Sequence, residues 1–168
     1  MPVVNNVTRL LDSRRVRYTA FELPAEKLGA LETARRLGVD PDRVFKTIVV
    51  LRASPGGKPV LAIIPGNRSL DLKALADFLK EKKMRLPPQR EAEALTGLQA
   101  GGISPLALIN KGFQILLDQS AQAFPEIHIS GGQRGLNIRL PVKDLVKLTN
   151  ARLANISGPL ESGESEED

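Results

Sequence analysis

Two double-glycine turns, about thirty residues apart, constrain the fold of this 168-residue chain more than any other feature of its sequence. One is segment 101–105 (GGISP) and the other is segment 130–135 (SGGQRG). Because glycine has no Cβ, it adopts positive φ readily and lets other atoms approach the backbone closely. Each turn alone is typical of a tight connection between strands. Together, and downstream of a lysine in an apolar strand, they predict the polar rim of a pocket.

That lysine is Lys46, which lies within 44–51 (VFKTIVVL), the most apolar strand-like run in the chain. Lysine is rarely buried without a partner, because its ammonium group loses hydration. Two interpretations stay open. Lys46 either lies at a strand edge or on the solvent face, where its stem covers apolar surface, or it points into a cavity and meets an anionic or carbonyl group. The neighbouring Thr47 is expected to face the other side of the pleat.

The scarcity of cysteine and histidine excludes several kinds of site. The chain has no cysteine, so disulfides, thiolate metal sites and a cysteine nucleophile are excluded. Its one histidine, His128, excludes a histidine metal cluster, and any Ser-His-Asp triad would have to use that residue. His128 lies between Ile127 and Ile129, which favours a solvated or structurally satisfied side chain. We therefore expect no metal and no cofactor.

The hydropathy of the chain predicts a soluble protein. No run of about 18 apolar residues could form a membrane span. Segment 1–6 lacks the basic start and apolar core of a signal peptide. We expect a cytoplasmic location and no membrane partner.

The net charge of +5 conceals a segregation of charge along the chain. Residues 161–168 carry five acidic residues and no basic one, and without them 24 basic residues face 14 acidic residues, a body of +10. The tail is polar and nearly free of apolar anchors, so we expect it to be disordered. A basic body favours a polyanionic partner such as nucleic acid, although basicity alone does not establish one.

Hydrophobic periodicity predicts an α+β fold. Helices are expected over 3–14, 30–37, 72–79, 89–96 and 141–148, and strands over 16–23, 44–51, 59–64, 113–117, 126–130 and 136–140, with a short strand near Leu153. Gly38 is expected to end the second helix, and Ser69 or Asp71 to begin the third. Because the order is mixed, we expect a mixed, mostly antiparallel sheet with peripheral helices. One domain over 1–158 would precede the tail, 159–168.

The motifs, taken in order, resemble the YbaK/EbsC family, free-standing aminoacyl-tRNA editing domains related to the insertion domain of bacterial prolyl-tRNA synthetase. The resemblance rests on Lys46-Thr47, Pro65, segment 70–73 (LDLK), segment 96–106 and segment 130–136. It spans roughly residues 3–156, nearly the whole chain apart from the tail. Within the superfamily, the pattern is most similar to the Cys-tRNA(Pro) deacylase branch.

The resemblance implies a YbaK-like fold, a mixed sheet flanked by helices, and a reaction. The reaction is trans-editing, the removal of a wrong amino acid from the 3′ end of tRNA, with Cys-tRNA(Pro) as the first candidate substrate. The implied catalytic residues are Lys46, Gly101 and Ser104. The implied substrate-binding residues are Thr47, Gly102, Ile103, Pro105, Gly131, Gly132 and Arg134. Segment 21–32 falls where family members carry part of the pocket rim, and Asn137 stands where related sequences often have an acidic residue.

The implied chemistry agrees with the residue inventory. Without a cysteine nucleophile, a metal cluster or a convincing triad, the pocket must act mainly by positioning and electrostatics. A cysteinyl ester could be attacked by its own thiol, as in a lyase, whereas a thiol-free ester would need a positioned water, as in a hydrolase. Both routes stay open, as does a partnership with prolyl-tRNA synthetase. The alternative from a different class is a non-catalytic module that binds the tRNA 3′ end or a nucleotide.

Overall fold

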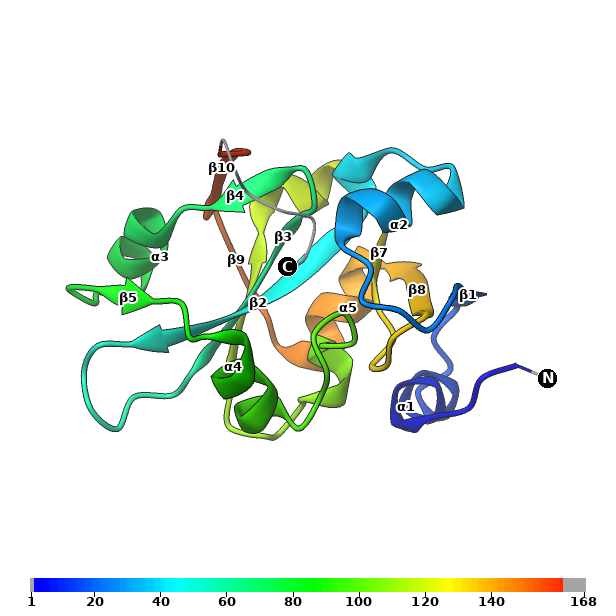
Figure 1. The fold of residues 1–168 in the computed structure, drawn as a ribbon, viewed down its shortest axis with the longest axis horizontal. Helices are drawn as coiled ribbons and strands as arrows, with labels where there is room; N and C mark the ends of the chain where they lie inside the picture. The colour runs from blue at the N-terminus through cyan, green and yellow to red at the C-terminus, as the bar shows by residue number, and fades with distance from the viewer. Residues whose placement is uncertain (1, 162–168) are drawn as a thin grey trace.

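The structure is a computed structural model that describes residues 2–161 (Figure 1). Residues 162–168, most of the expected acidic tail, lie outside the described residues, as does Met1. The helices are α1 (Asn6–Ser13), α2 (Ala30–Leu37), α3 (Leu72–Leu79), α4 (Gln89–Thr96) and α5 (Val142–Thr149). The strands are β1 (Thr19–Glu22), β2 (Phe45–Arg52), β3 (Val60–Pro65), β4 (Arg68–Leu70), β5 (Met84–Arg85), β6 (Gln114–Asp118), β7 (Glu126–Ser130), β8 (Leu136–Pro141), β9 (Arg152–Ala154) and β10 (Ser157–Pro159).

These strands form three sheets. The largest has the order β5-β2-β3-β6-β9, in which β2 is antiparallel to β3 and β5, while β3-β6 and β6-β9 are parallel. The antiparallel order β1-β8-β7 makes the second sheet, and the antiparallel pair β10-β4 makes the third. An isolated bridge between Val44 and His128 connects the two larger sheets. The predicted α+β class, with mixed and mainly antiparallel pairing, is confirmed, although the strands are divided rather than joined in one sheet.

Strands β2 and β3 form an antiparallel hairpin, and β3 is the middle strand of the large sheet. The β2-β3 ladder runs from the pair Phe45 and Pro65 to the pair Val50 and Val60. All six residues of β3 are buried, because β2 and β6 flank it and both of its faces are covered. On the other side of β2, the short strand β5 pairs only with Leu51 and Arg52. Most of the outer edge of β2 is therefore not covered by β5.

Apolar side chains cover both faces of the five-stranded sheet. On one face, the three-stranded sheet, α1 and α5 enclose the larger core, which includes Leu11, Phe45, Val49, Leu61, Ile63, Leu117, Ile127, Ile138 and Leu145. On the other face, α3 packs Leu75 and Ala76 against Val50, Ala62 and Ile64. Lys46 therefore shares a face of β2 with Val50, whereas Thr47 shares the opposite face with Val49.

The helix ends follow from local sequence signals. Gly38 ends α2 in the left-handed region with φ +69°, as expected of a glycine at this position. Of the two candidates for the start of α3, Asp71 is the N-cap, and its side chain accepts a hydrogen bond from Ala74 N at 2.9 Å. The short strands β4, β5 and β10 were not predicted, because two or three residues carry no measurable periodicity.

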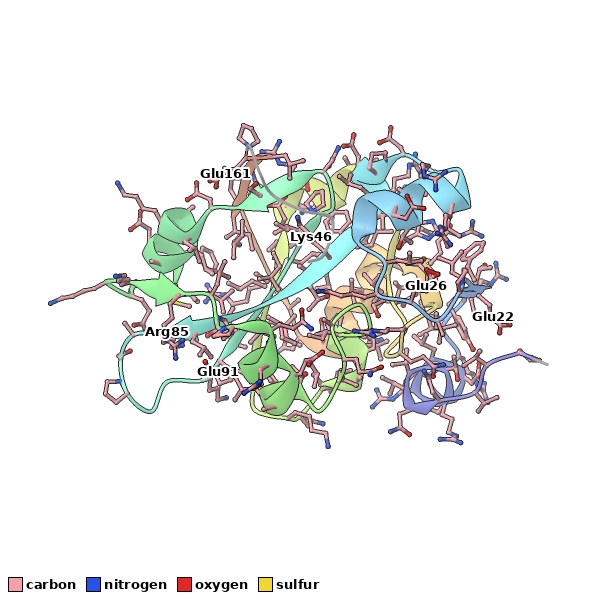
Figure 2. The ribbon with its side chains drawn as sticks, in the orientation of Figure 1. Glu22, Glu26, Lys46, Arg85, Glu91 and Glu161 are labelled. Atoms are coloured by element: carbon pink, nitrogen blue, oxygen red, sulfur yellow. The ribbon has the colours of Figure 1, made fainter. Side chains whose placement is uncertain are left out.

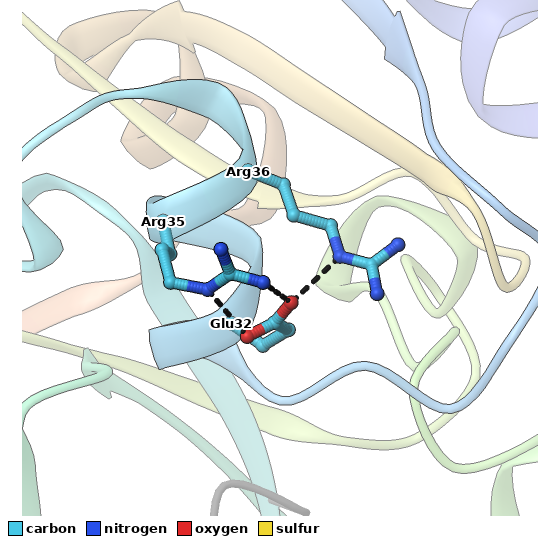
Figure 3. A network of polar contacts seen from close by, with 3 residues as sticks. All are labelled: Glu32, Arg35 and Arg36. Atoms are coloured by element: carbon cyan, nitrogen blue, oxygen red, sulfur yellow. Dashed lines mark hydrogen bonds and ion pairs between the residues drawn. The ribbon is translucent and has the colours of Figure 1, made fainter.

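The surface of α2 carries an ion-pair network (Figure 3). Glu32 accepts from Arg35 Nε at 2.9 Å and from Arg36 Nε at 2.7 Å, and it also contacts Arg35 Nη2. These bonds, the one from Arg35 first, lower the pKa of Glu32 to about 2. The positive charge of Arg35 and Arg36 is therefore partly neutralised by a carboxylate on the same helix.

Across residues 2–161, no helix has both the length and the hydrophobicity needed to cross a lipid bilayer.

Candidate functional site

A pocket of about 250 Å³ lies against the uncovered edge of β2. This volume is somewhat below the about 300–1,000 Å³ typical of sites for drug-sized ligands, which favours a small ligand group. In Figure 1, β2 runs diagonally across the molecule between α2 and α4. The pocket walls come from the loop after β1, the first half of α2, residues 44–49, residues 86–93, the first glycine turn, Ser130 and residues 135–137.

Lys46 and Thr47 both line this pocket, from opposite faces of one strand. Because the β5 ladder reaches only Leu51 and Arg52, the edge of the strand at residues 45–49 is part of the pocket wall. Lys46 is the second residue of β2 (Figure 2), and it is only 6% exposed. Lys46 is therefore a buried residue of the pocket wall and does not lie on a solvent face.

Thr47 contributes a hydroxyl with unused hydrogen-bonding capacity. Its Oγ1 is buried and has no hydrogen-bond partner within residues 2–161. A buried hydroxyl left without a partner costs about 1–3 kcal/mol. A polar ligand group that reached this atom would recover part of that free energy.

The two glycine turns contact each other directly. A Cβ on Gly102 would lie 2.9 Å from the Arg134 nitrogen and equally close to the Gln133 backbone, so only glycine permits this approach. Arg134 Nε also donates to the Ala100 carbonyl at 2.7 Å. Gly101, with φ +89°, lies on the pocket side of this contact. The two turns therefore pack against each other, with Gly101 of the first turn on the pocket wall.

Only some of the residues implied by the family resemblance reach the pocket. Lys46, Thr47, Gly101 and Ile103 line it. The others, Gly102, Ser104, Pro105, Gly131, Gly132 and Arg134, are outside its wall and pack behind it or beside it. Ser104 is fully buried, and its Oγ accepts a hydrogen bond from Leu106 N at 3.2 Å as the cap of a 3₁₀ turn, Pro105–Ala107. The hydroxyl therefore holds the backbone just after the first glycine turn.

Asn5, which precedes α1, holds the second glycine turn. Its Oδ1 accepts from Thr8 N at 2.9 Å as the helix cap, while its Nδ2 donates to Gly131 O at 2.9 Å and to Gln133 Oε1 at 3.0 Å. One amide thus joins the N-terminal helix to a turn more than a hundred residues away. Sequence reasoning did not identify this link, because an N-cap asparagine is explained by the helix alone.

Several pocket residues were not identified from the sequence. Glu26 and Lys27 come from the loop after β1, a segment that the resemblance placed at the rim without assigning residues. Lys27 Nζ donates to Gln89 Oε1 at 2.7 Å, which connects this loop to the start of α4. Glu93, also on α4, accepts from Ala100 N at 2.7 Å. On a short polar helix such residues look like a solvated face, so the sequence carried no signal for them.

A buried polar pair borders the pocket. His128 is 3% exposed and its Nδ1 lies 2.8 Å from Oδ1 of Asn137, a residue that lines the pocket. A neutral imidazole can donate from Nδ1 to this amide oxygen. The expectation of a structurally satisfied histidine is therefore met. The pair also fixes the orientation of the Asn137 amide.

This histidine should make stability depend on pH. Burial lowers the pKa of His128 below its ordinary 6.5; Asn137 and Glu126 raise it in part, and Arg139 and Arg43 lower it further. As pH falls below about 6.5, the unfolded chain binds a proton that the folded protein does not, so stability falls. We expect the melting temperature to drop between about pH 7 and pH 5.5, and to drop less in His128→Gln, whose amide does not titrate. Equal pH dependence in both proteins would contradict this assignment.

Within residues 2–161, no group of three or more histidine, aspartate or glutamate side chains is arranged to hold a metal ion.

Comparisons with known proteins place this chain among its relatives. Residues 25–148 match the model of the aminoacyl-tRNA editing domain. The chain is 36% identical over 154 residues to EbsC of Enterococcus faecalis, whose name proposes a Cys-tRNA(Pro)/Cys-tRNA(Cys) deacylase, with 90% of this chain and 92% of EbsC covered. It is 28% identical over 110 residues to the proline–tRNA ligase of Pediococcus pentosaceus. The aligned region covers 64% of this chain but only 19% of the ligase.

Solved structures show the same fold. The hypothetical protein APE2540 superposes with a TM-score of 0.82 at 23% identity, covering 92% of this chain and 100% of that one. A protein described as a proposed trans-editing enzyme for prolyl-tRNA synthetase superposes with a TM-score of 0.77 at 24% identity, covering 94% and 99%. The family match includes every residue that lines the pocket except Leu23. The chain belongs to the aminoacyl-tRNA editing domain family.

Proposed function

We propose that this protein is a trans-editing aminoacyl-tRNA deacylase, and that Cys-tRNA(Pro) is its first candidate substrate. The observation that carries the proposal is the meeting of Lys46 and the Gly101 turn in one small pocket. The name of EbsC supports the cysteinyl substrate, and the similarity to a segment of a proline–tRNA ligase supports a connection with tRNA(Pro). A cytoplasmic location and a partnership with prolyl-tRNA synthetase belong to the same proposal.

Each residue on the pocket wall has a role in this proposal. Lys46 places a positive charge where the ester region or the 3′-terminal adenosine enters. The interaction of that charge with the ligand is stronger in a confined site of low dielectric than in water. The backbone N–H of Gly101 stabilises the negative charge that develops on the carbonyl oxygen. Thr47 Oγ1 gives the ligand a further polar contact, and Ile103 provides apolar surface for a small side chain.

The pocket can serve two routes of attack. In the first, the thiol of a cysteinyl group attacks its own ester carbonyl, the new carbon–sulfur bond replaces the bond to oxygen, and the tRNA leaves with a protonated 3′ or 2′ oxygen. In the second, water adds to the carbonyl and the products are a free amino acid and the same tRNA. Both routes need orientation of the ester and stabilisation of the oxyanion more than a protein nucleophile.

A panel of aminoacylated tRNAs tests the proposal. Cys-, Ala-, Ser- and Pro-tRNA(Pro) are incubated with the purified protein, and the released amino acid and its cyclised product are quantified separately. We expect release from Cys-tRNA(Pro) and much slower release from Pro-tRNA(Pro). Binding without release from any member of the panel would favour the alternative function, a non-catalytic module that binds the tRNA 3′ end.

The charge of the body predicts how tRNA binding responds to salt. If the +10 body holds tRNA through phosphate contacts, affinity should fall steeply as salt rises, because condensed counterions are released on binding. Deleting residues 161–168 should leave folding intact and leave affinity equal or slightly higher. Titrations at two salt concentrations check both statements. Salt-independent affinity, or loss of binding on tail deletion, would contradict the electrostatic account.

A further inference from the structure

The first glycine turn contains a peptide group whose orientation must be fixed. Gly102 N donates to Gln99 O at 2.8 Å, and Gly101, third in the turn, has φ +89°. A positive φ at this position is typical of a type II turn, whereas a type I turn has a negative φ there. The two types differ mainly in a rotation of the central peptide, which here joins Ala100 to Gly101. Whatever holds this peptide decides whether its N–H or its C=O faces the pocket.

Two side chains from separate elements hold Ala100. Arg134 Nε donates to the Ala100 carbonyl at 2.7 Å, and Glu93 Oε2 accepts from the Ala100 N–H at 2.7 Å. Both bonds involve an ionised side chain, and such bonds are about twice as strong as neutral ones. Arg134 comes from the second glycine turn and Glu93 from α4. The Ala100 N–H is therefore held by a side chain seven residues earlier, and the Ala100 carbonyl by a side chain 34 residues later.

The direction of the Gly101 N–H follows from these contacts. No peptide bond in the described chain is cis, so the Gly101 N–H points opposite to the Ala100 C=O across the planar peptide. That carbonyl points toward Arg134, which is not part of the pocket wall, whereas Ala100 and Gly101 are. The Gly101 N–H therefore points away from Arg134, and Gly101 itself is part of the pocket wall.

We propose that Glu93 and Arg134 are positioning residues that fix the type II turn and so present the Gly101 N–H to the ester carbonyl of the substrate. The inference rests on the proposed deacylase function and assigns Arg134 a role different from the substrate binding implied by the family resemblance. Glu93 lines the pocket, where a carboxylate could be mistaken for a general base, but its Oε2 already accepts the Ala100 N–H. Both side chains fix the conformation of the turn through hydrogen bonds to Ala100, and the Gly101 N–H of the turn contacts the substrate.

Matched amide and apolar variants separate positioning from charge. Glu93→Gln keeps an acceptor oxygen, and Arg134→Gln keeps an N–H donor at the place of Nε, while both remove the charge. Glu93→Met and Arg134→Met keep a side chain of similar length and remove the hydrogen bond. We expect kcat to fall about ten- to hundredfold in the methionine variants, less than the 10²–10³ of losing an oxyanion donor outright. The KM of the methionine variants should stay within about threefold of wild type, and so should the kcat and KM of the glutamine variants.

Other outcomes would overturn the proposal. Equal losses in Glu93→Gln and Glu93→Met would show that the carboxylate itself is needed. A raised KM and a shallower salt dependence in Arg134→Gln would indicate a phosphate contact. Wild-type activity in all four variants would show that the turn does not need these bonds. If a methionine variant fails to fold, as thermal unfolding would show, its glutamine counterpart still decides between positioning and charge.

A measurement without substrate separates this proposal from the proposed function. Hydrogen exchange of the Ala100 amide should be faster in Glu93→Met than in wild type and in Glu93→Gln, because only methionine removes the acceptor. Failure of the wild-type protein to release any amino acid would refute the deacylase function and leave this result standing. An unchanged exchange rate of the Ala100 amide in Glu93→Met would refute the proposal that Glu93 fixes the turn, whatever the activity of the variant.

Discussion

Lys46→Ala is expected to reduce the rate of deacylation by about 10²–10³-fold, the range found when a group that stabilises developing charge is removed. The side chain is 6% exposed and lines the pocket, and we propose that its charge acts on the bound ester. The fold should gain little from a buried ammonium, and we expect the melting temperature to be unchanged or higher in the variant. Single-turnover release and thermal unfolding, measured on the same preparation, check the two statements together.

Lys46→Arg and Lys143→Ala complete this test. A planar guanidinium does not replace a compact ammonium in a tight pocket, so we expect the arginine variant to be impaired as well. Lys143 is an exposed lysine on α5, away from the pocket, and its removal should leave the rate unchanged. Full activity in Lys46→Arg would mean that a diffuse positive charge is sufficient. Full activity in Lys46→Ala would refute the site assignment.

Gly101→Ala is expected to lower the rate about a hundredfold and to destabilise the fold. An alanine disfavours φ +89°, at a cost of about 1–3 kcal/mol, and its Cβ would lie 3.2 Å from the Lys27 Cα. The turn would relax toward type I geometry, which rotates the central peptide and turns the Gly101 N–H away from the pocket. Steady-state kinetics and denaturant unfolding measure the two effects separately.

The matched control for this variant is Gly38→Ala at the end of α2. Gly38 has φ +69°, and a Cβ there would meet no atom within 4 Å, so the substitution adds a similar backbone cost without steric conflict. Gly38 is also outside the pocket wall. We expect it to lose stability and keep its deacylation rate. If both variants lost activity in proportion to stability, the Gly101 effect would be one of folding and not of the site.

Much of the fold could be predicted because its elements carry strong local signals. The range predicted for α4 and that for β7 agree with the structure, and those for β2 and β3 agree to within one residue at each end. In these segments periodicity, caps and turn residues indicate the same boundaries. The division of the strands among three sheets could not be predicted, because it depends on contacts between segments far apart in the chain.

The parts of the candidate site that could be predicted are those with residue types that are unusual in their local sequence. Lys46 in an apolar strand and glycine pairs in two turns are unusual locally, and the structure brings them together. Glu93 and Asn5 gave no such mark, because each has an ordinary local explanation as a surface carboxylate or a helix cap. Their longer-range role is visible only from hydrogen bonds to segments that fold back on them, at Ala100 and Gly131.

The most direct test of the account follows binding and release in a single sample of Cys-tRNA(Pro) under single-turnover conditions, for wild type and for Lys46→Ala. We predict that both proteins bind the tRNA with similar salt dependence, because phosphate contacts supply most of the affinity. Only the wild type should release the cysteinyl group, at a rate at least about a hundredfold above that of the variant. Equal release by both proteins, or tight binding by wild type without release, would contradict the claim that this pocket is a deacylase site.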